Sequence, residues 1–350
     1  MQRKKKIAII GSSGYTGLEL LKLVLGHSNC EPYFLMSRTY AGMKVSDVFP
    51  SIVTDNDKDI PFFKIFDKRI CKASDVIFLC LPPGKSMEFI KDNLKNSNSL
   101  IIDVGSDYRM DDPKDYSKWY KIDHVTKGLM RSFVYGLCEF NREKIKKARM
   151  IANPGCYPTS VLLGLIPLIS SNIEIFKDVI VDSKSGVTGA GKKLSQDFLF
   201  GNLNENFYSY KPIMHRHIGE MEIQLEKITK RKTIISFTPH LLPVDRGIFS
   251  SIYLRCKEAV SQKEIDSVYD DAYSGEMFVN YFIDKVPHIK DVTGTNNCNI
   301  NAVFDERTKT IKVFTVIDNL IKGAAGQAIQ NMNIALGLPE CEGLKKQGAF

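Results

Sequence analysis

Cys156 is the residue whose surroundings in this 350-residue chain best suit covalent chemistry. It follows the turn-forming residues 153–155 (Asn-Pro-Gly). The apolar segment from Thr159 to Ile169 predicts a helix directly after it, with Pro158 suited to the first turn. A thiol at the start of a helix experiences the positive end of the helix dipole and backbone N–H groups, which lower its pKa. We therefore predict that Cys156 is a nucleophile.

The other cysteines carry no comparable signal. The chain has eight, without a CxxC pair or a spacing typical of a disulfide framework, and the remaining seven are expected to be inert small residues. This pattern is typical of reduced thiols in a cytosolic protein. The apolar run from Ile7 to Ile10 is too short for a signal peptide, so we expect a cytoplasmic location.

Two histidines are the candidates for acid–base chemistry. The segment His215-Arg216-His217-Ile218-Gly219-Glu220 is the densest ionisable cluster in the second half of the chain. Residues two apart cannot share a helix face, so we expect one imidazole to face the cysteine and the other to point elsewhere, toward substrate or Glu220. A metal site is the alternative, but it lacks a further nearby His or Cys ligand, and no metal is predicted.

A glycine-rich segment suits the phosphates of a nucleotide. Gly11-Ser12-Ser13-Gly14-Tyr15-Thr16-Gly17 follows a predicted strand, Ile7 to Ile10, and opens a predicted helix with Leu18, Leu21 and Leu25 on one face. Its GxxGxxG spacing is a weak motif by itself and gains weight from this strand-to-helix context. The predicted coenzyme contacts in it are Gly11, Ser13, Gly14, Tyr15, Thr16 and Gly17.

The end of the second predicted strand indicates which coenzyme is bound. In NAD-specific proteins an acidic residue about twenty positions after the glycines holds the ribose hydroxyls. Here the strand ends in Met36-Ser37-Arg38 with no carboxylate in reach. A hydroxyl and a guanidinium favour a 2′-phosphate, so we predict NADP(H), with Ser37 and Arg38 as its contacts.

Together the thiol and the nicotinamide site indicate one class of reaction. A thioester is an acyl group that hydride can reduce, whereas a carboxylate is not, and the resulting thiohemiacetal collapses to an aldehyde with help from an acid–base group. The sequence therefore predicts reduction of an activated acyl group through a thioester on Cys156.

Two domains are needed to position these residues. Apolar runs at Val76 to Leu81 and Leu100 to Val104 extend the first βαβ unit into a doubly wound parallel sheet. Longer strand-like segments after about residue 155 predict an α+β domain, and the helix-forming stretch Ala324 to Leu336 is expected to pack back on the first domain. We expect residues 1–155 and 324–350 to form a Rossmann-type coenzyme domain, and 156–323 an α+β catalytic domain.

Composition excludes several classes of protein. Gly 24 and Pro 14 are ordinary counts, and the apolar runs are far shorter than a membrane span. The net charge of +8 suits anionic ligands but is spread along the chain, without a stripe for nucleic acid. No membrane or nucleic-acid partner is predicted.

Six segments in chain order resemble the N-acetyl-gamma-glutamyl-phosphate reductases of arginine biosynthesis. They are GSSGYTG at 11–17, NPGCYPT at 153–159, SGVTGAG at 185–191, HRHIGE at 215–220, HLLPVDRG at 240–247 and DNLIKGAAGQAIQNMN at 318–333. The resemblance implies NADPH-dependent reduction of N-acetyl-gamma-glutamyl phosphate to N-acetylglutamate 5-semialdehyde and phosphate. It also implies a fold like aspartate-semialdehyde and glyceraldehyde-phosphate dehydrogenases, and a homodimer or homotetramer.

The resemblance also assigns roles to further residues. It implies Cys156 as the acyl acceptor, with the acid–base group drawn from His215 and His217. Gly186 and Asn319 are expected near the nicotinamide. Expected substrate contacts are Arg109, Asn153, Ser185, Lys192, Arg216, Glu220 and Arg246. Many relatives have Pro at Gly219, Ser at Thr188 and Arg at Lys192, which affects helix entry and one anion contact.

Other functions remain open at this point. Aspartate-semialdehyde dehydrogenase shares the chemistry with a shorter substrate, and a related reductase of lysine biosynthesis acts on an amino-adipyl phosphate. An NADP-binding sensor without activity would not need both Cys156 and the histidine block. A cysteine hydrolase would not need the glycine loop.

Overall fold

The computed structural model describes residues 3–53, 62–67, 69, 73–94, 97–192 and 195–348. The chain folds as two compact units, Met1–Pro154 with Ala324–Leu344, and Gly155–Gly323 with Lys345–Phe350. The expected division placed all residues after 323 in the first domain and differs at the tail. There, the backbone oxygens of Lys345 and Lys346 accept hydrogen bonds from Asn296 N and Asn297 Nδ2 of the second unit.

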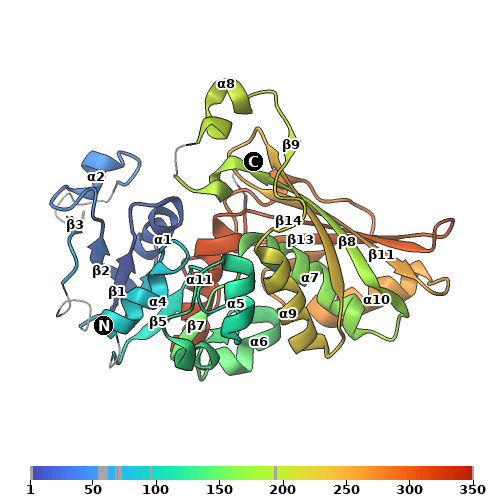
Figure 1. The fold of residues 1–350 in the computed structure, drawn as a ribbon, viewed down its shortest axis with the longest axis horizontal. Helices are drawn as coiled ribbons and strands as arrows, with labels where there is room; N and C mark the ends of the chain where they lie inside the picture. Colours follow the sequence, from blue (N-terminus) through green and yellow to red (C-terminus); the bar gives the residue numbers. More distant parts are fainter. Residues whose placement is uncertain are drawn as a thin grey trace. The chain divides into compact units, whose positions relative to one another are not determined.

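The first unit is built on a parallel sheet, so the predicted doubly wound sheet is confirmed (Figure 1). Its central strands are short apolar runs buried on both faces, as parallel strands covered by helices require. The second strand begins at Cys30 and ends at Met36, where its end was predicted. In spatial order the described strands are β3 (Phe63–Lys64), β2 (Cys30–Met36), β1 (Lys5–Ile10), β4 (Val76–Leu79), β5 (Leu100–Asp103), β7 (Met150–Ala152) and β6 (Val134–Tyr135).

Helices cover this sheet. The predicted terminal helix is present as α11 and contacts α1 and α6, which confirms that it packs within the first unit. In α1 the fully buried hydrophobic residues are Leu20, Leu21 and Val24, whereas Leu18 and Leu25 are only partly buried. The described helices of this unit are α1 (Tyr15–Leu25), α2 (Val45–Val48), α4 (Lys85–Phe89), η2 (Ile90–Leu94), α5 (Pro113–Tyr120), η3 (Lys127–Ser132), α6 (Cys138–Ile145) and α11 (Gly326–Leu336).

The second unit is built on a mixed sheet. Its long central strands alternate buried and exposed residues, as in a sheet with one covered face. In spatial order the described strands are β12 (Val279–Tyr281), β13 (Cys298–Asp305), β14 (Thr310–Ile317), β11 (Ile248–Cys256), β8 (Ile175–Gly186), β10 (Ile234–Leu242) and β9 (Tyr208–Ser209).

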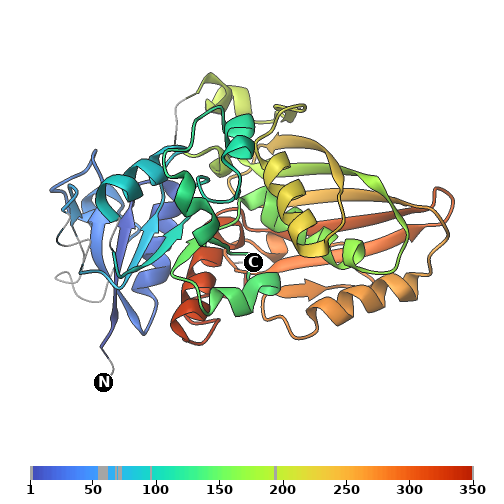
Figure 2. The same ribbon diagram turned by 60° about the horizontal axis from the view of Figure 1, so that its bottom comes forward.

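Three helices lie on the covered face of this second sheet: α7 (Cys156–Ser170), α9 (His217–Thr229) and α10 (Gln262–Tyr273) (Figure 2). Helix α7 is apolar all round and buried from Tyr157 to Ile169, because the sheet, α9 and α10 all contact it. The shorter elements are η4 (Val187–Ala190), η5 (Gln196–Phe198), α8 (Phe200–Leu203), η6 (Ile289–Asp291) and η7 (Ile321–Ala325). Among the described residues, no helix is long and apolar enough to span a membrane.

Candidate active site

The glycine loop joins β1 to α1 in the first unit, and two of its glycines are required by geometry. Gly11 has φ +87°, and a Cβ there would lie 2.4 Å from the backbone oxygen of Cys80. A Cβ on Gly17 would lie 2.5 Å from the oxygen of Gly11, so the helix start packs directly on the loop. Leu18 N makes the first helical hydrogen bond, to Gly14 O, so the earlier amides of α1 do not bond within the helix. The loop therefore fits the phosphates of a dinucleotide.

Serines fix this loop to the end of β2. Ser12, to which the sequence pattern assigns no role, is fully buried and donates from Oγ to Met36 O at 2.9 Å. Ser37 Oγ donates to Ser13 Oγ at 3.0 Å, so these two predicted coenzyme contacts lie side by side. Arg38 follows them and is exposed. A hydroxyl pair and an exposed guanidinium at the end of β2 fit a phosphorylated ribose.

The residues after β5 form a buried polar cluster. Asp107 caps the start of α4, accepting hydrogen bonds from Gly84 N and Met87 N. Burial and the charge of Asp107 raise the pKa of Asp103 to about 7. Arg109 donates from Nε to Asn153 O at 2.8 Å and from Nη2 to Val104 O at 3.0 Å. Arg109, an expected substrate contact, therefore also supports the backbone beside it.

Asn153, an expected substrate contact, makes hydrogen bonds within the first unit. Its side chain is fully buried, with Nδ2 donating to Ala324 O and Oδ1 accepting from Asn331 Nδ2. The two amide atoms thus bond to the chain just before α11 and to the middle of α11, within the first unit. Asn153 therefore has a structural role, and its contact with substrate stays a prediction.

Cys156 is the first residue of α7, which begins three residues earlier than predicted. Gly155 is the N-cap, and its amide donates to the buried carboxylate of Glu220 on α9 at 2.8 Å. Gly323 lies against the cysteine, because a Cβ there would be 2.8 Å from Cys156 Cβ. The cysteine is thus held from two sides, and it is partly exposed. Glu220, expected to contact substrate, fixes the turn that carries the nucleophile.

The two imidazoles lie close together, and the expectation that one faces the cysteine while the other points elsewhere stays a prediction. His215 and His217 have ring centroids 4.9 Å apart, and both rings contact Tyr157, the residue after the cysteine. The reason is that α9 begins at His217, with Arg216 as its N-cap. The helical spacing rule therefore does not apply to this pair. Arg216, between them in the sequence, is exposed.

His215 is held as a neutral imidazole. Burial, helped by the positive charges of Arg216 and Lys211, lowers its pKa to about 3. Its Nδ1 accepts a hydrogen bond from His217 N at 3.2 Å, so the ring proton is on Nε2. His215 therefore offers a hydrogen-bond donor but takes up no proton near neutral pH.

The loop after β8 is tied to the turn before β11. Gly186 N donates to Gly247 O, and a Cβ on Gly186 would lie 2.7 Å from Asp245 O. Asn319 accepts from Gly247 N and donates to Thr188 Oγ1. Gly186 and Asn319, expected near the nicotinamide, thus make hydrogen bonds within this part of the second unit.

The remaining predicted substrate contacts differ in exposure. Ser185 is buried beside Tyr157, where burial raises the pKa of the tyrosine and a hydrogen bond with Ser185 opposes that effect. Arg246 lies 3.5 Å from the buried Asp318 carboxylate, and its own side chain is partly exposed. Lys192 is exposed, although partial desolvation lowers its pKa. Arg246 and Lys192 can reach an anionic ligand.

Histidines and cysteines outside the site have structural surroundings. His27 and His124 are buried and hydrogen-bonded, and His288 is exposed. None of the seven described cysteines forms a disulfide, and Cys71 lies outside the described residues. Within the described part of the chain, no group of three His, Cys, Asp or Glu side chains is arranged for a metal.

Two protein-family models of semialdehyde dehydrogenases match most of the chain. The NAD binding domain matches residues 6–148, and the dimerisation domain matches residues 156–319. A protein of Pelotomaculum thermopropionicum is 41% identical over 99% of both chains, and one of Methanococcus maripaludis is 43% identical over 98% of this chain and 99% of its own. Both relatives carry the name N-acetyl-gamma-glutamyl-phosphate reductase. The chain belongs to this family. The resemblance drawn from the six segments is confirmed.

Solved structures support the fold. Aspartate semialdehyde dehydrogenase II of Vibrio cholerae superposes with a TM-score of 0.72, covering 96% of this chain and 99% of its own, at 16% identity. The enzyme of Candida albicans, crystallised with NADP, gives a TM-score of 0.70 at 16% identity, covering 95% of this chain and 99% of its own. At this identity the likeness concerns fold alone. The chain is an oxidoreductase whose first unit binds a nicotinamide coenzyme.

Proposed function

We propose that this member of the reductase family reduces N-acetyl-gamma-glutamyl phosphate to N-acetylglutamate 5-semialdehyde with release of phosphate. The observation that carries the chemistry is the second-unit cluster, in which Cys156 starts α7 beside Tyr157 and both imidazoles pack on that tyrosine. The relatives of more than 40% identity carry the substrate assignment. Aspartate-semialdehyde dehydrogenase remains the competing activity, because a solved structure of that enzyme shares this fold.

Cys156 performs the covalent step. Its sulfur attacks the carbonyl carbon of the acyl phosphate, the S–C bond forms, and the C–O bond to phosphate breaks as phosphate leaves. Bound NADPH supplies the hydride that reduces the thioester. Cys156 is close in sequence to β7, because only three residues separate it from the carboxyl end of this strand. Ligands bind at that end of the strands in a parallel sheet.

The histidine pair is assigned to the proton transfer at the thiohemiacetal oxygen. The thiohemiacetal oxygen needs a donor while it carries charge, and that proton must leave when the C–S bond breaks and aldehyde is released. His215 is neutral with its proton on Nε2, so we assign it to donating a hydrogen bond. We assign His217 to moving the proton, and Arg109, Lys192 and Arg246 to the anionic groups of the substrate.

We propose NADP(H) as the coenzyme. The support is the end of β2, where Ser37 bonds to Ser13 of the glycine loop and is followed by the exposed Arg38. Exchanging Arg38→Asp should raise the KM for NADPH much more than the KM for NADH. An equal change for both coenzymes would remove the assignment.

The function is tested in the reverse direction by following NADP+ reduction. Purified protein should reduce NADP+ when given both phosphate and N-acetylglutamate semialdehyde, and it should not when either is omitted. Cys156→Ser should abolish this turnover while the dissociation constant for NADPH stays within about twofold. Faster turnover with aspartate semialdehyde would replace the proposal by the competing activity.

A further inference from the structure

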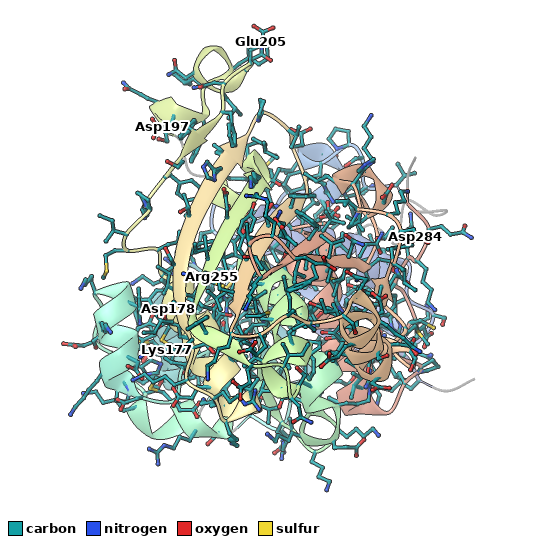
Figure 3. The ribbon with its side chains drawn as sticks, turned by 90° about the vertical axis from the view of Figure 1, so that its right-hand side faces the viewer. Lys177, Asp178, Asp197, Glu205, Arg255 and Asp284 are labelled. Carbon is teal, nitrogen blue, oxygen red and sulfur yellow. The ribbon has the colours of Figure 1, made fainter. Side chains whose placement is uncertain are left out.

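A segment of the second unit outside the site described so far returns to the cysteine. This arm, residues 195–210, contains η5, α8 and β9, and it projects beyond the strands of the sheet, carrying Asp197 and Glu205 outward (Figure 3). It rejoins the sheet at β9, which pairs with β10 through Ser209 and Tyr208. Its last residue, Tyr210, donates its amide to Pro239 O at 3.0 Å.

Tyr210 turns its side chain toward the cysteine site. Its hydroxyl lies 3.1 Å from the Tyr157 hydroxyl, and its ring is 5.8 Å from that of His215. Tyr157 is fixed in turn by edge contacts with both imidazoles and with Phe237. The aromatic box of Tyr157, His215, His217 and Phe237 is thus bonded to the arm through one hydroxyl pair.

The hydroxyl pair is buried, and Tyr157 directly follows the reactive cysteine in α7. Burial raises the pKa of Tyr210 to about 12, and a negative charge on Cys156 contributes to the same direction. Burial likewise raises the pKa of Tyr157, again with a contribution from Cys156. Both phenols therefore keep their protons, and each interacts electrostatically with the charge of Cys156.

The arm is also anchored without the Tyr210 hydroxyl. Phe207 stacks on His240 with ring centroids 5.0 Å apart, and β9 pairs with β10 by backbone bonds. Removing the single hydroxyl of Tyr210 should therefore leave the arm in place. A change in the chemistry of Cys156 would then report the hydroxyl contact itself.

We propose that Tyr210 is a positioning residue of the cysteine site, which acts through Tyr157 to hold the aromatic box beside the sulfur. The arm then contributes to the reaction although it carries no acid–base group of the mechanism. The predicted effect on turnover rests on the proposed function, but the predicted effect on the reactivity of the Cys156 thiol does not.

The test compares Tyr210→Phe, Tyr157→Phe and the double variant with wild type. Tyr208→Phe is the matched control, because Tyr208 lies on the same arm and its hydroxyl donates instead to Asp197 O at 3.4 Å. Tyr210→Phe should slow iodoacetamide labelling of Cys156 at neutral pH by about threefold or more. It should lower kcat about tenfold with KM changed less than twofold.

Coupling separates positioning from a general structural effect. If the two hydroxyls act as one contact, the double variant should lose no more activity than the more affected single variant. Unchanged labelling in a folded Tyr210→Phe protein, or labelling equally slowed by Tyr208→Phe, overturns the proposal. If no acyl phosphate is reduced but labelling slows as expected, the proposed function fails and the positioning role stands.

Discussion

Gly323 shows how little room the nucleophile has. A Cβ at this position would lie 2.8 Å from Cys156 Cβ and 3.2 Å from the α-carbon of the same residue. Such short separations require the cysteine or η7 to move, and a shift of the nucleophile by a fraction of an ångström lowers its rate of attack. Gly323→Ala is expected to lower kcat at least tenfold, with about 1–3 kcal/mol lost from the free energy of unfolding.

Steady-state kinetics and denaturant titration check this expectation. Gly275→Ala is the control, because a Cβ at Gly275 in the same unit meets no atom within 4 Å. That variant should retain wild-type kcat. Wild-type activity in Gly323→Ala would show that the site tolerates the displacement and would contradict the tight packing.

His215 should make the protein acid-sensitive. Its folded pKa of about 3 lies below the ordinary histidine value of 6.5, so acid protonates the unfolded chain first. The stabilisation from neutral His215 is complete above pH 6.5 and is lost as the pH falls from there toward 3. Between pH 7 and pH 5 this single group should remove about 2 kcal/mol from the free energy of unfolding.

Urea titrations at the two pH values measure the loss. His215→Gln should show a pH 7 to pH 5 difference smaller than the wild type by that amount, whereas His288→Gln, at an exposed histidine, should match the wild type. Equal acid dependence in the wild type and His215→Gln would mean that the ring is not held neutral by burial.

Residue types predict the reacting groups but not the supporting ones. Cys156 is recognisable because its signal is local, a thiol between a turn and a helix. The roles of Glu220, Asn153 and Asn319 depend on partners 65 to 178 positions away in the chain, such as Gly155 for Glu220 and Asn331 for Asn153. From the sequence alone, a polar side chain that bonds to a residue far along the chain cannot be distinguished from one that binds a ligand.

At the scale of elements, the turn from β1 into α1 makes a separate prediction. Gly11 combines a positive φ with a 2.4 Å approach to Cys80 O, so alanine there must displace the loop from the end of β4. Gly11→Ala should raise the dissociation constant for NADPH at least tenfold, because the loop amides would no longer be aligned for the phosphates.

Fluorescence titration with NADPH checks the loop prediction. Gly26→Ala, at the other end of α1, is the control, because its Cβ would make only ordinary contacts of 3.7 Å or more and its φ is negative. Its NADPH affinity should equal the wild-type value. Unchanged affinity in Gly11→Ala would place the phosphates elsewhere.

Element boundaries decide where sequence-based prediction succeeds and fails. The short buried strands and the terminal helix are predictable from the sequence. Continuous apolar runs between glycines and prolines are compatible with few structures other than buried strands. The histidine pair is not predictable, because α9 starts at His217 with no Ser, Thr, Asp or Asn cap to mark the boundary. The start of α7 lies three residues before the apolar run that predicts it, since its first residues are Cys, Tyr and Pro.

At the scale of the whole molecule, one face of the second sheet carries exposed apolar residues. Helices α7, α9 and α10 cover one face, and on the other face Ile180 is 53% exposed and Ile234 46% exposed. Phe176 lies on the same face, under the guanidinium of Arg255 at 5.4 Å. Figure 3 shows Arg255 and Asp178 on these strands. Exposed apolar residues rimmed by charged ones mark an interaction surface, and two copies of one chain most often pair through the same surface.

We therefore expect a homodimer formed by the open face, in the region matched by the dimerisation model. Ile180→Glu would place a carboxylate in that interface without a partner and should weaken the dimer by at least about 100-fold. Light scattering coupled to gel filtration should then find monomer where the wild type is dimeric. Phe200→Glu is the control, because Phe200 is 80% exposed on the arm and not on this face. If Phe200→Glu dissociates the dimer and Ile180→Glu does not, the arm forms the interface instead.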